Sequence, residues 1–227
     1  MSWLLLGVLL FGLLYGPQLW VQQVLARHHR QPEENFPGTG GELARHLLDR
    51  FGLQEVKVEA TDLGDHYDPL SRSVRLTPDK LEGRTLTAIT VAAHECGHAL
   101  QHAAGEPLFR WRTRLAQTAV LATRLGSFLL FAAPVLMVLT RMPSSGLVSA
   151  LGAFLMLGFG ILVQLVTLPV ELDASFRKAL PLLSSGYLEE RQLPAARQIL
   201  RAAAWTYVAA ALASLLNFWR WLAIMKR

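Results

Sequence analysis

Two histidines and a glutamate stand in a pattern that suits metal-assisted hydrolysis. His94 is followed directly by Glu95, and His98 comes four positions after His94. Residues four positions apart share one face of an α-helix, so both imidazoles can bind the same ion. Glu95 would lie beside that ion and take a proton from a water molecule as the catalytic base. A helix with two structural or surface histidines is the alternative on the pattern alone.

The sequence around this motif predicts a helix over 85–104. Thr85 is a suitable N-cap residue, and Gly105 followed by Pro107 is typical of a helix end. Apolar residues flank the motif on several faces, which indicates a buried helix. Because buried imidazoles need polar partners, a metal ion would satisfy both of them.

A catalytic zinc site needs a third protein ligand and one open position. His102 would lie about 12 Å along the helix from His94, at about 1.5 Å per residue, so one ion cannot reach both. Glu171 follows a long apolar run, where an acid is costly unless it is solvated, paired or bound to metal. Glu171 and Asp173 could simply be an acid pair at a membrane interface. With the histidine motif present, Glu171 is the leading third ligand of one Zn²⁺ per chain.

The chain is more apolar than most soluble proteins. Of its 227 residues, 52% are hydrophobic, whereas about 45–50% including glycine is usual. Long uncharged stretches predict a mainly α, polytopic membrane protein with about four transmembrane helices. The second and fourth stretches are weaker and could be buried helices of a soluble domain. The expected organisation is an N-terminal anchor (1–26), a soluble zincin-like region (27–115), a transmembrane hairpin (116–170), a cytoplasmic helical segment with the third ligand (171–201) and a C-terminal transmembrane helix (202–225).

The soluble region is expected to contain a short amphipathic helix over 40–52 and a small β-hairpin. Residues 56–60 and 73–77 have the alternation of strands, and 68–72 reads as the turn between them. The edge of such a hairpin could bind an extended peptide.

Topology and charge give an orientation. Four spans return the chain to the side of His94 and His98 just before Glu171. Arginines near the predicted span ends gather on that side, so the positive-inside rule makes it cytoplasmic, although the basic C-terminal tail argues against this. The net charge of +5 is explained by these arginines beside anionic lipid, and no nucleic-acid partner is expected. The single cysteine excludes an intrachain disulfide.

The motif at 94–98 together with Glu171-Leu172-Asp173-Ala174-Ser175 resembles the YugP-like zinc-dependent membrane metallopeptidases. The resemblance runs from about Gly38 to about Leu222 and includes, in order, 65–69, 91–95, 164–171, 200–204 and 206–212. It implies zinc, a location in the cell membrane and hydrolysis of a peptide or protein substrate. It does not identify that substrate, and the oligomeric state is open.

Gluzincin-type peptidases, which the motif resembles, place an aspartate four residues after the glutamate ligand, where it hydrogen-bonds a metal-binding histidine. Ser175 stands at that position. Asp173 would point away from Glu171 on a helix. Ser175, Asp173 and His102 are therefore the candidates for supporting the ligands. The side chains with suitable chemistry for the oxyanion or the substrate are His66, Tyr67, Tyr187 and Arg177.

The predicted activity is that of a zinc metalloendopeptidase. Zinc would lower the pKa of a bound water to near neutral, and Glu95 would move its proton to the leaving amine. Two alternatives stay open: a metal-stabilised scaffold or regulator without catalysis, and a zinc hydrolase that acts on a non-peptide bond. Structural zinc sites usually have four protein ligands, often cysteines, whereas only three good ligands are apparent here.

Overall fold

The computed structural model describes residues 12, 15–16, 19–20, 23–24 and 36–208. Most of the predicted anchor 1–26 and of the predicted helix 202–225 therefore lies outside the described residues. The described part of the chain is mainly helical, as expected, and contains one small sheet. Its elements are α2 (Gly40–Arg50), β1 (Lys57–Ala60), β2 (His66–Asp68), β3 (Ser73–Leu76), α3 (Pro78–Leu81), α4 (Leu86–Ala103), α5 (Pro107–Thr140), α6 (Pro143–Asp173), the π-helical η1 (Ala174–Ala179), α7 (Leu180–Leu182), η2 (Leu183–Tyr187) and a helix over 193–208.

The motif helix α4 runs through the core at one end of the molecule. It corresponds to the predicted helix 85–104, and the hydroxyl of Thr85 caps it by accepting from the amide of Ala88 at 3.2 Å. Helix α2 packs along α4 and begins with a capping box between Thr39 and Glu42. The apolar face of α2 is buried against α4 and the sheet, which fixes the position of the motif helix.

The sheet has the strand order β1-β3-β2, and this corrects the predicted hairpin. Strands β1 and β3 are the two that the sequence predicts, but they run parallel. The antiparallel hairpin is formed by β2 and β3, because the chain crosses to the far edge before the tight turn at 69–72. Val74 and Leu76 lie on the central strand and are fully buried, so this strand has no free edge for a peptide.

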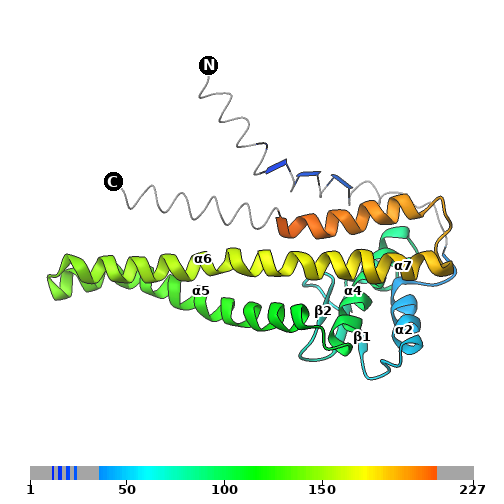
Figure 1. Cartoon of the computed structure of the whole chain (residues 1–227), viewed down its shortest axis with the longest axis horizontal. Coiled ribbons are helices and arrows are strands. Elements are labelled where there is room, and N and C mark those ends of the chain that lie inside the picture. Colours follow the sequence, from blue (N-terminus) through cyan, green and yellow to red (C-terminus); the bar gives the residue numbers. More distant parts are fainter. Residues whose placement is uncertain (1–11, 13–14, 17–18, 21–22, 25–35, 209–227) are drawn as a thin grey trace, which may run out of the picture.

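Helices α5 and α6 form a long antiparallel hairpin that extends away from this core (Figure 1). The chain reverses at Arg141, which takes a left-handed conformation with φ of 51° at the end of α5. Pro134 lies inside α5 and leaves the carbonyl of residue 130 without its helical partner. A bend of 41° occurs at this place, between Pro107–Leu129 and Phe131–Thr140.

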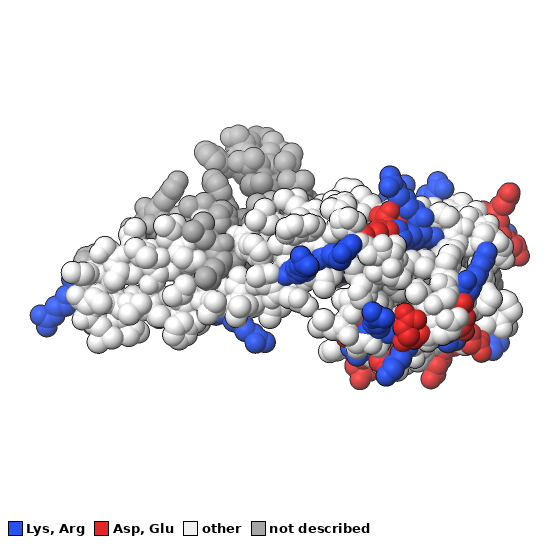
Figure 2. Space-filling model, turned by 60° about the horizontal axis from the view of Figure 1, so that its bottom comes forward, with Lys and Arg blue, Asp and Glu red and all other residues white. Residues whose placement is uncertain are grey.

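The arm of this hairpin is apolar on its outside. On the face seen in Figure 2, the charged side chains gather over the end of the molecule that holds the core, and few lie along the arm. Large exposed apolar side chains on the two helices include Leu121, Leu125, Phe128, Phe131, Val138, Leu139, Leu147, Val148, Leu151, Leu162 and Leu165. A surface of this kind is typical of helices in contact with lipid or with another protein.

Length and composition select one candidate membrane helix in the described part of the chain, Gly158–Tyr187. The bent pair in α5 would add a second if it counts as one span. The four predicted spans are therefore not established, because the described residues contain one or two.

Candidate metal centre

Three ligand atoms converge where α4 meets the end of α6. Nε2 of His94 lies 3.2 Å from Oε2 of Glu171, and Nε2 of His98 lies 3.3 Å from the same oxygen. The ligand atoms of the three residues all lie within 4.8 Å of one another. All three side chains are buried, and Glu171 is only 1% exposed. The structure thus brings together the three side chains that the sequence nominates as metal ligands.

Gly97 explains how the two helices approach so closely. A Cβ at this position would lie 2.9 Å from the backbone carbonyl oxygen of Ala174. Any side chain would therefore push α4 away from η1, where α6 ends. The glycine inside the motif lets the histidines of α4 reach Glu171.

The outer nitrogen of each imidazole is held by a neighbouring side chain. Nδ1 of His94 lies 3.1 Å from the hydroxyl of Ser175. Nδ1 of His98 lies 2.9 Å from Oε1 of the buried Gln101. With both Nδ1 atoms occupied, the Nε2 atoms face Glu171. Metal-binding histidines usually have a partner of this kind on the nitrogen that does not bind the ion.

The donor set fits a zinc ion. Two imidazoles and one carboxylate are a common ligand set of catalytic zinc. Oε1 of Glu171 is buried without a hydrogen-bond donor, although Nη2 of Arg112 lies 3.3 Å away and forms an ion pair with it. Nε2 of both imidazoles and Oε2 of Glu171 meet at one point, and their lone pairs there suit a bound cation.

Glu95 lies beside the ligands and lines the same cavity as His94 and Glu171. It is 6% exposed. Burial raises the pKa of Glu95 to about 7, with His94 acting against this shift and the charge of Glu171 adding to it. A bound cation would favour the carboxylate form. The side chain is thus placed to exchange a proton with a molecule in the cavity.

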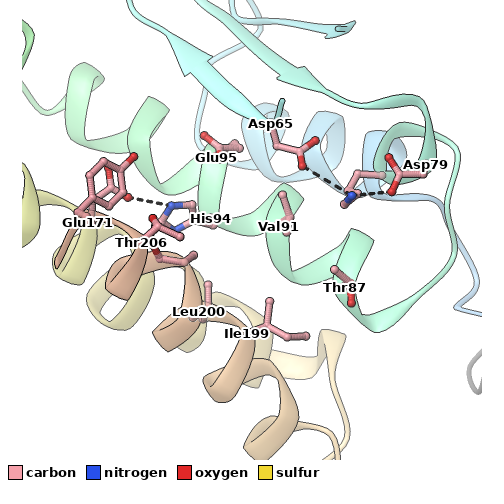
Figure 3. A pocket seen from close by; sticks show the side chains of 13 residues that line it. Asp65, Asp79, Thr87, Val91, His94, Glu95, Glu171, Ile199, Leu200 and Thr206 are labelled. Carbon is pink, nitrogen blue, oxygen red and sulfur yellow. Dashed lines mark hydrogen bonds and ion pairs between the residues drawn. The ribbon is translucent and has the colours of Figure 1, made fainter. Parts of the chain in front are cut away.

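The cavity runs between α4 and the helix 193–208 (Figure 3). Its volume is about 500 Å³. Apolar walls come from Val91 on α4 and from Ile199 and Leu200 on the opposite helix. Away from the ligands the cavity reaches Asp65 and Lys80, whose charges pair at 3.9 Å. The cavity, called the slot below, thus has one polar region at His94, Glu95 and Glu171 and a second, charged one at Asp65 and Lys80.

The other residues nominated from the sequence lie further out. Nδ1 of His102 forms a hydrogen bond of 2.8 Å with the hydroxyl of Tyr67, and both rings pack on Phe109. Asp173 contacts Gln101 at 2.9 Å and no ligand directly. The ring of Phe109 also contacts the imidazole of His98, with ring centroids 6.1 Å apart, so it connects His102 and Tyr67 to this ligand.

None of the four proposed oxyanion or substrate residues lines the cavity. Tyr67 contacts His102 and Phe109, and the other three have partners elsewhere. His66 is 2.8 Å from the carbonyl of Gly64. Tyr187 contacts His46 of α2 at 2.8 Å. The side chain of Arg177 is 83% exposed and lies 4.0 Å from Asp173.

The structure adds residues that the sequence does not single out. Arg112 reaches Glu171 from α5, and Tyr207 lines the cavity from the helix 193–208. Gln101 follows His98 by three positions, a helical spacing that could have drawn attention to it. For Arg112 no local signal exists, because its contact depends on how α5 docks.

Comparisons with known proteins identify the family of the chain. Residues 3–226 match the model of the family described as "Putative neutral zinc metallopeptidase". The chain is also 35% identical over 226 residues to "Putative membrane protease YugP" of Bacillus subtilis (strain 168), which covers 99% of this chain and 96% of that protein. No solved structure matches. The chain belongs to this zinc metallopeptidase family, and the resemblance inferred from the sequence is confirmed.

Proposed function

We propose that this member of the zinc metallopeptidase family is a membrane-embedded endopeptidase that holds one zinc ion on His94, His98 and Glu171. The observation that carries the proposal is the buried cluster of three ligand atoms within 4.8 Å, with Glu95 lining the same cavity. When bound, zinc acts as a Lewis acid that lowers the pKa of water and polarises a carbonyl group. This donor set leaves room for substrate, unlike a closed structural site.

Glu95 is the general base in this proposal. Its carboxylate takes a proton from the attacking water and passes it to the amine that leaves. Burial keeps competing solvent away from this carboxylate, since it is 6% exposed. The neighbouring His94 and His98 are held by Ser175 and Gln101 and so keep their orientation during the reaction.

The hydrogen-bond donor for the oxyanion is assigned to Tyr207. This phenol lines the cavity together with His94 and Glu95. Its hydroxyl also interacts with the carboxylate of Glu171, which brings the donor next to the proposed ion. A donor placed where charge develops lowers the barrier by several kcal/mol, roughly 3–4 kcal/mol in known cases. Arg112 is the other nearby donor, but its charge is paired with Glu171.

The substrate is proposed to be an extended peptide or protein segment with apolar side chains. Val91, Ile199 and Leu200 form the apolar walls of the slot that begins at the ligands. A peptide lying there would place its carbonyl beside the ligands and an apolar side chain between the two helices.

The bilayer is the second proposed partner, and the chain is proposed to cross it several times. The apolar segment 147–170 of α6 is about 36 Å long at about 1.5 Å per residue, enough for a hydrocarbon core of about 30 Å. This segment overlaps the candidate membrane helix Gly158–Tyr187 but ends before Glu171. With this boundary the metal centre would lie at the membrane surface. The arginines at this end support a cytoplasmic position for it by the positive-inside rule.

The test uses protein purified in detergent, with metal analysis and a proteome-wide comparison of cleavage products. Glu95→Gln should retain zinc and lose cleavage. The matched control is Glu82→Gln, because Glu82 is an exposed glutamate outside the cavity lining, and it should behave as wild type. Zinc without any cleavage that depends on Glu95 would favour a metal-stabilised scaffold. Full activity of Glu95→Gln would refute the assignment of the base.

A further inference from the structure

Gln101 is fully buried one helical turn after His98, and each polar atom of its side chain has a partner. Its Oε1 lies 2.9 Å from Nδ1 of His98. Its Nε2 donates to the carbonyl oxygen of Val170 and to Oδ2 of Asp173, both at 2.9 Å. A buried amide with all its hydrogen bonds made keeps one orientation and holds its neighbours in place.

The partners decide which end of the amide faces the histidine. The carbonyl of Val170 can only accept a hydrogen bond. The carboxylate of Asp173 also accepts, since Lys178 donates to the same oxygen at 2.5 Å. The reversed amide would set its own oxygen against both of these acceptors. The NH₂ group therefore faces Val170 and Asp173, and Oε1 faces His98.

This orientation fixes the tautomer of His98. Because Oε1 of Gln101 accepts, Nδ1 of His98 must carry the hydrogen and donate it. Nε2 is then the nitrogen with the free lone pair, and it lies 3.3 Å from Oε2 of Glu171. His94 differs, because the hydroxyl of Ser175 can donate or accept at 3.1 Å and so permits either tautomer.

We propose that Gln101 is a positioning residue of the metal centre, which presents Nε2 of His98 to the ion by locking the imidazole in its Nδ1–H tautomer. The inference rests on the zinc site of the proposed function. Asp173 acts on His98 through Gln101 rather than directly. Lys178 extends this connection to Oε1 of Glu106 at 2.6 Å, at the start of α5.

Two substitutions separate positioning from simple structural support. Gln101→Met removes the acceptor opposite Nδ1 and adds no charge. Gln101→Glu keeps an acceptor there but sets a second carboxylate oxygen against Val170 and Asp173, which destabilises the metal-free fold more. Zinc affinity is measured by competition with a chromophoric chelator, and the melting temperature is measured without metal. Ser175→Ala serves as the comparison at the other histidine.

Positioning predicts that Gln101→Met loses about 10- to 100-fold in zinc affinity, as is usual for such partners. Gln101→Glu should bind zinc more tightly than Gln101→Met although its melting temperature is lower. The opposite order of affinities, or a Gln101→Met affinity equal to wild type, would overturn the inference.

A second measurement does not depend on the variants folding. In wild-type protein labelled with [¹⁵N]histidine, the imidazoles whose signals shift on adding zinc should include one with a protonated Nδ1 and a metal-bound Nε2. If every zinc-sensitive imidazole binds through Nδ1, the inference fails. If wild type binds no zinc at all, the proposed function fails first. The two failures are therefore distinguishable.

Discussion

Substituting Gly97 with alanine tests whether the contact between α4 and η1 sets the geometry of the metal centre. A Cβ at Gly97 would lie 2.9 Å from the carbonyl oxygen of Ala174, whereas ordinary contacts begin at 3.4 Å. The helices would have to separate by about 0.5 Å, because close-packed backbone does not yield in place. His94 and His98 move with α4, while Glu171 stays with α6.

The expected effects on stability nearly cancel, but the effect on zinc does not. Overpacking costs about 1–3 kcal/mol, and alanine in place of glycine inside a helix recovers about 1 kcal/mol. The free energy of unfolding should therefore fall by about 0–2 kcal/mol. Because binding sites tolerate displacements of only about 0.5 Å, zinc affinity should fall by about 10-fold or more.

The assay is zinc competition with a chelator, together with thermal unfolding in the same detergent. Gly160→Ala is the matched control, because a Cβ at Gly160 of α6 meets nothing within 4 Å, and it should bind zinc as wild type does. If Gly97→Ala binds zinc as tightly as Gly160→Ala, the close approach at Gly97 does not set the positions of the ligands.

Three further predictions address the cavity and the sheet. Tyr207→Phe should lower kcat about 100- to 1,000-fold, and the loss of zinc affinity should be much smaller although the hydroxyl interacts with Glu171. Equal losses of both would instead make Tyr207 part of the metal site. Val91→Trp should fill part of the cavity of about 500 Å³ and lower kcat/KM for peptides at least about 10-fold, while zinc is retained. An unchanged kcat/KM would show that the substrate binds elsewhere. For Asp68, burial alone would raise the pKa, but hydrogen bonds from Ser71 and Leu70, with the charge of Arg75, bring it below the ordinary value of 3.8. Its stabilisation is therefore present above that value and lost as the pH falls through the lowered pKa. Asp68→Asn should thus flatten the fall of thermal stability at pH values below 3.8, and an unchanged fall would contradict this.

Local spacing made the centre of the site predictable from the sequence. His94 and His98 depend only on helical geometry, and α4 begins within one residue of the expected position. Glu171 is predicted as a ligand because an acidic side chain directly after a long apolar run costs free energy unless it has a partner. These are properties of short segments, which the sequence displays directly.

Contacts between distant segments could not be predicted in this way. The strands 57–60 and 73–76 were recognisable, but their parallel pairing depends on β2 taking the opposite edge. Tyr187 has suitable chemistry for the site and instead packs on α2. Arg112 reaches Glu171 only because α5 docks beside α6. The local sequence of these segments does not indicate which distant segment each one will contact.

The separation of Glu171 from His94 by 77 positions has a consequence for biosynthesis. The whole α5–α6 hairpin lies between them, so a growing chain cannot assemble the ligand set until the hairpin has been made and has folded back. Zinc would then connect α4 to the end of α6 and stabilise the state in which the α5–α6 hairpin has folded back over the state in which it has not. Under the proposed function, the chain therefore stays inactive until this hairpin has been made.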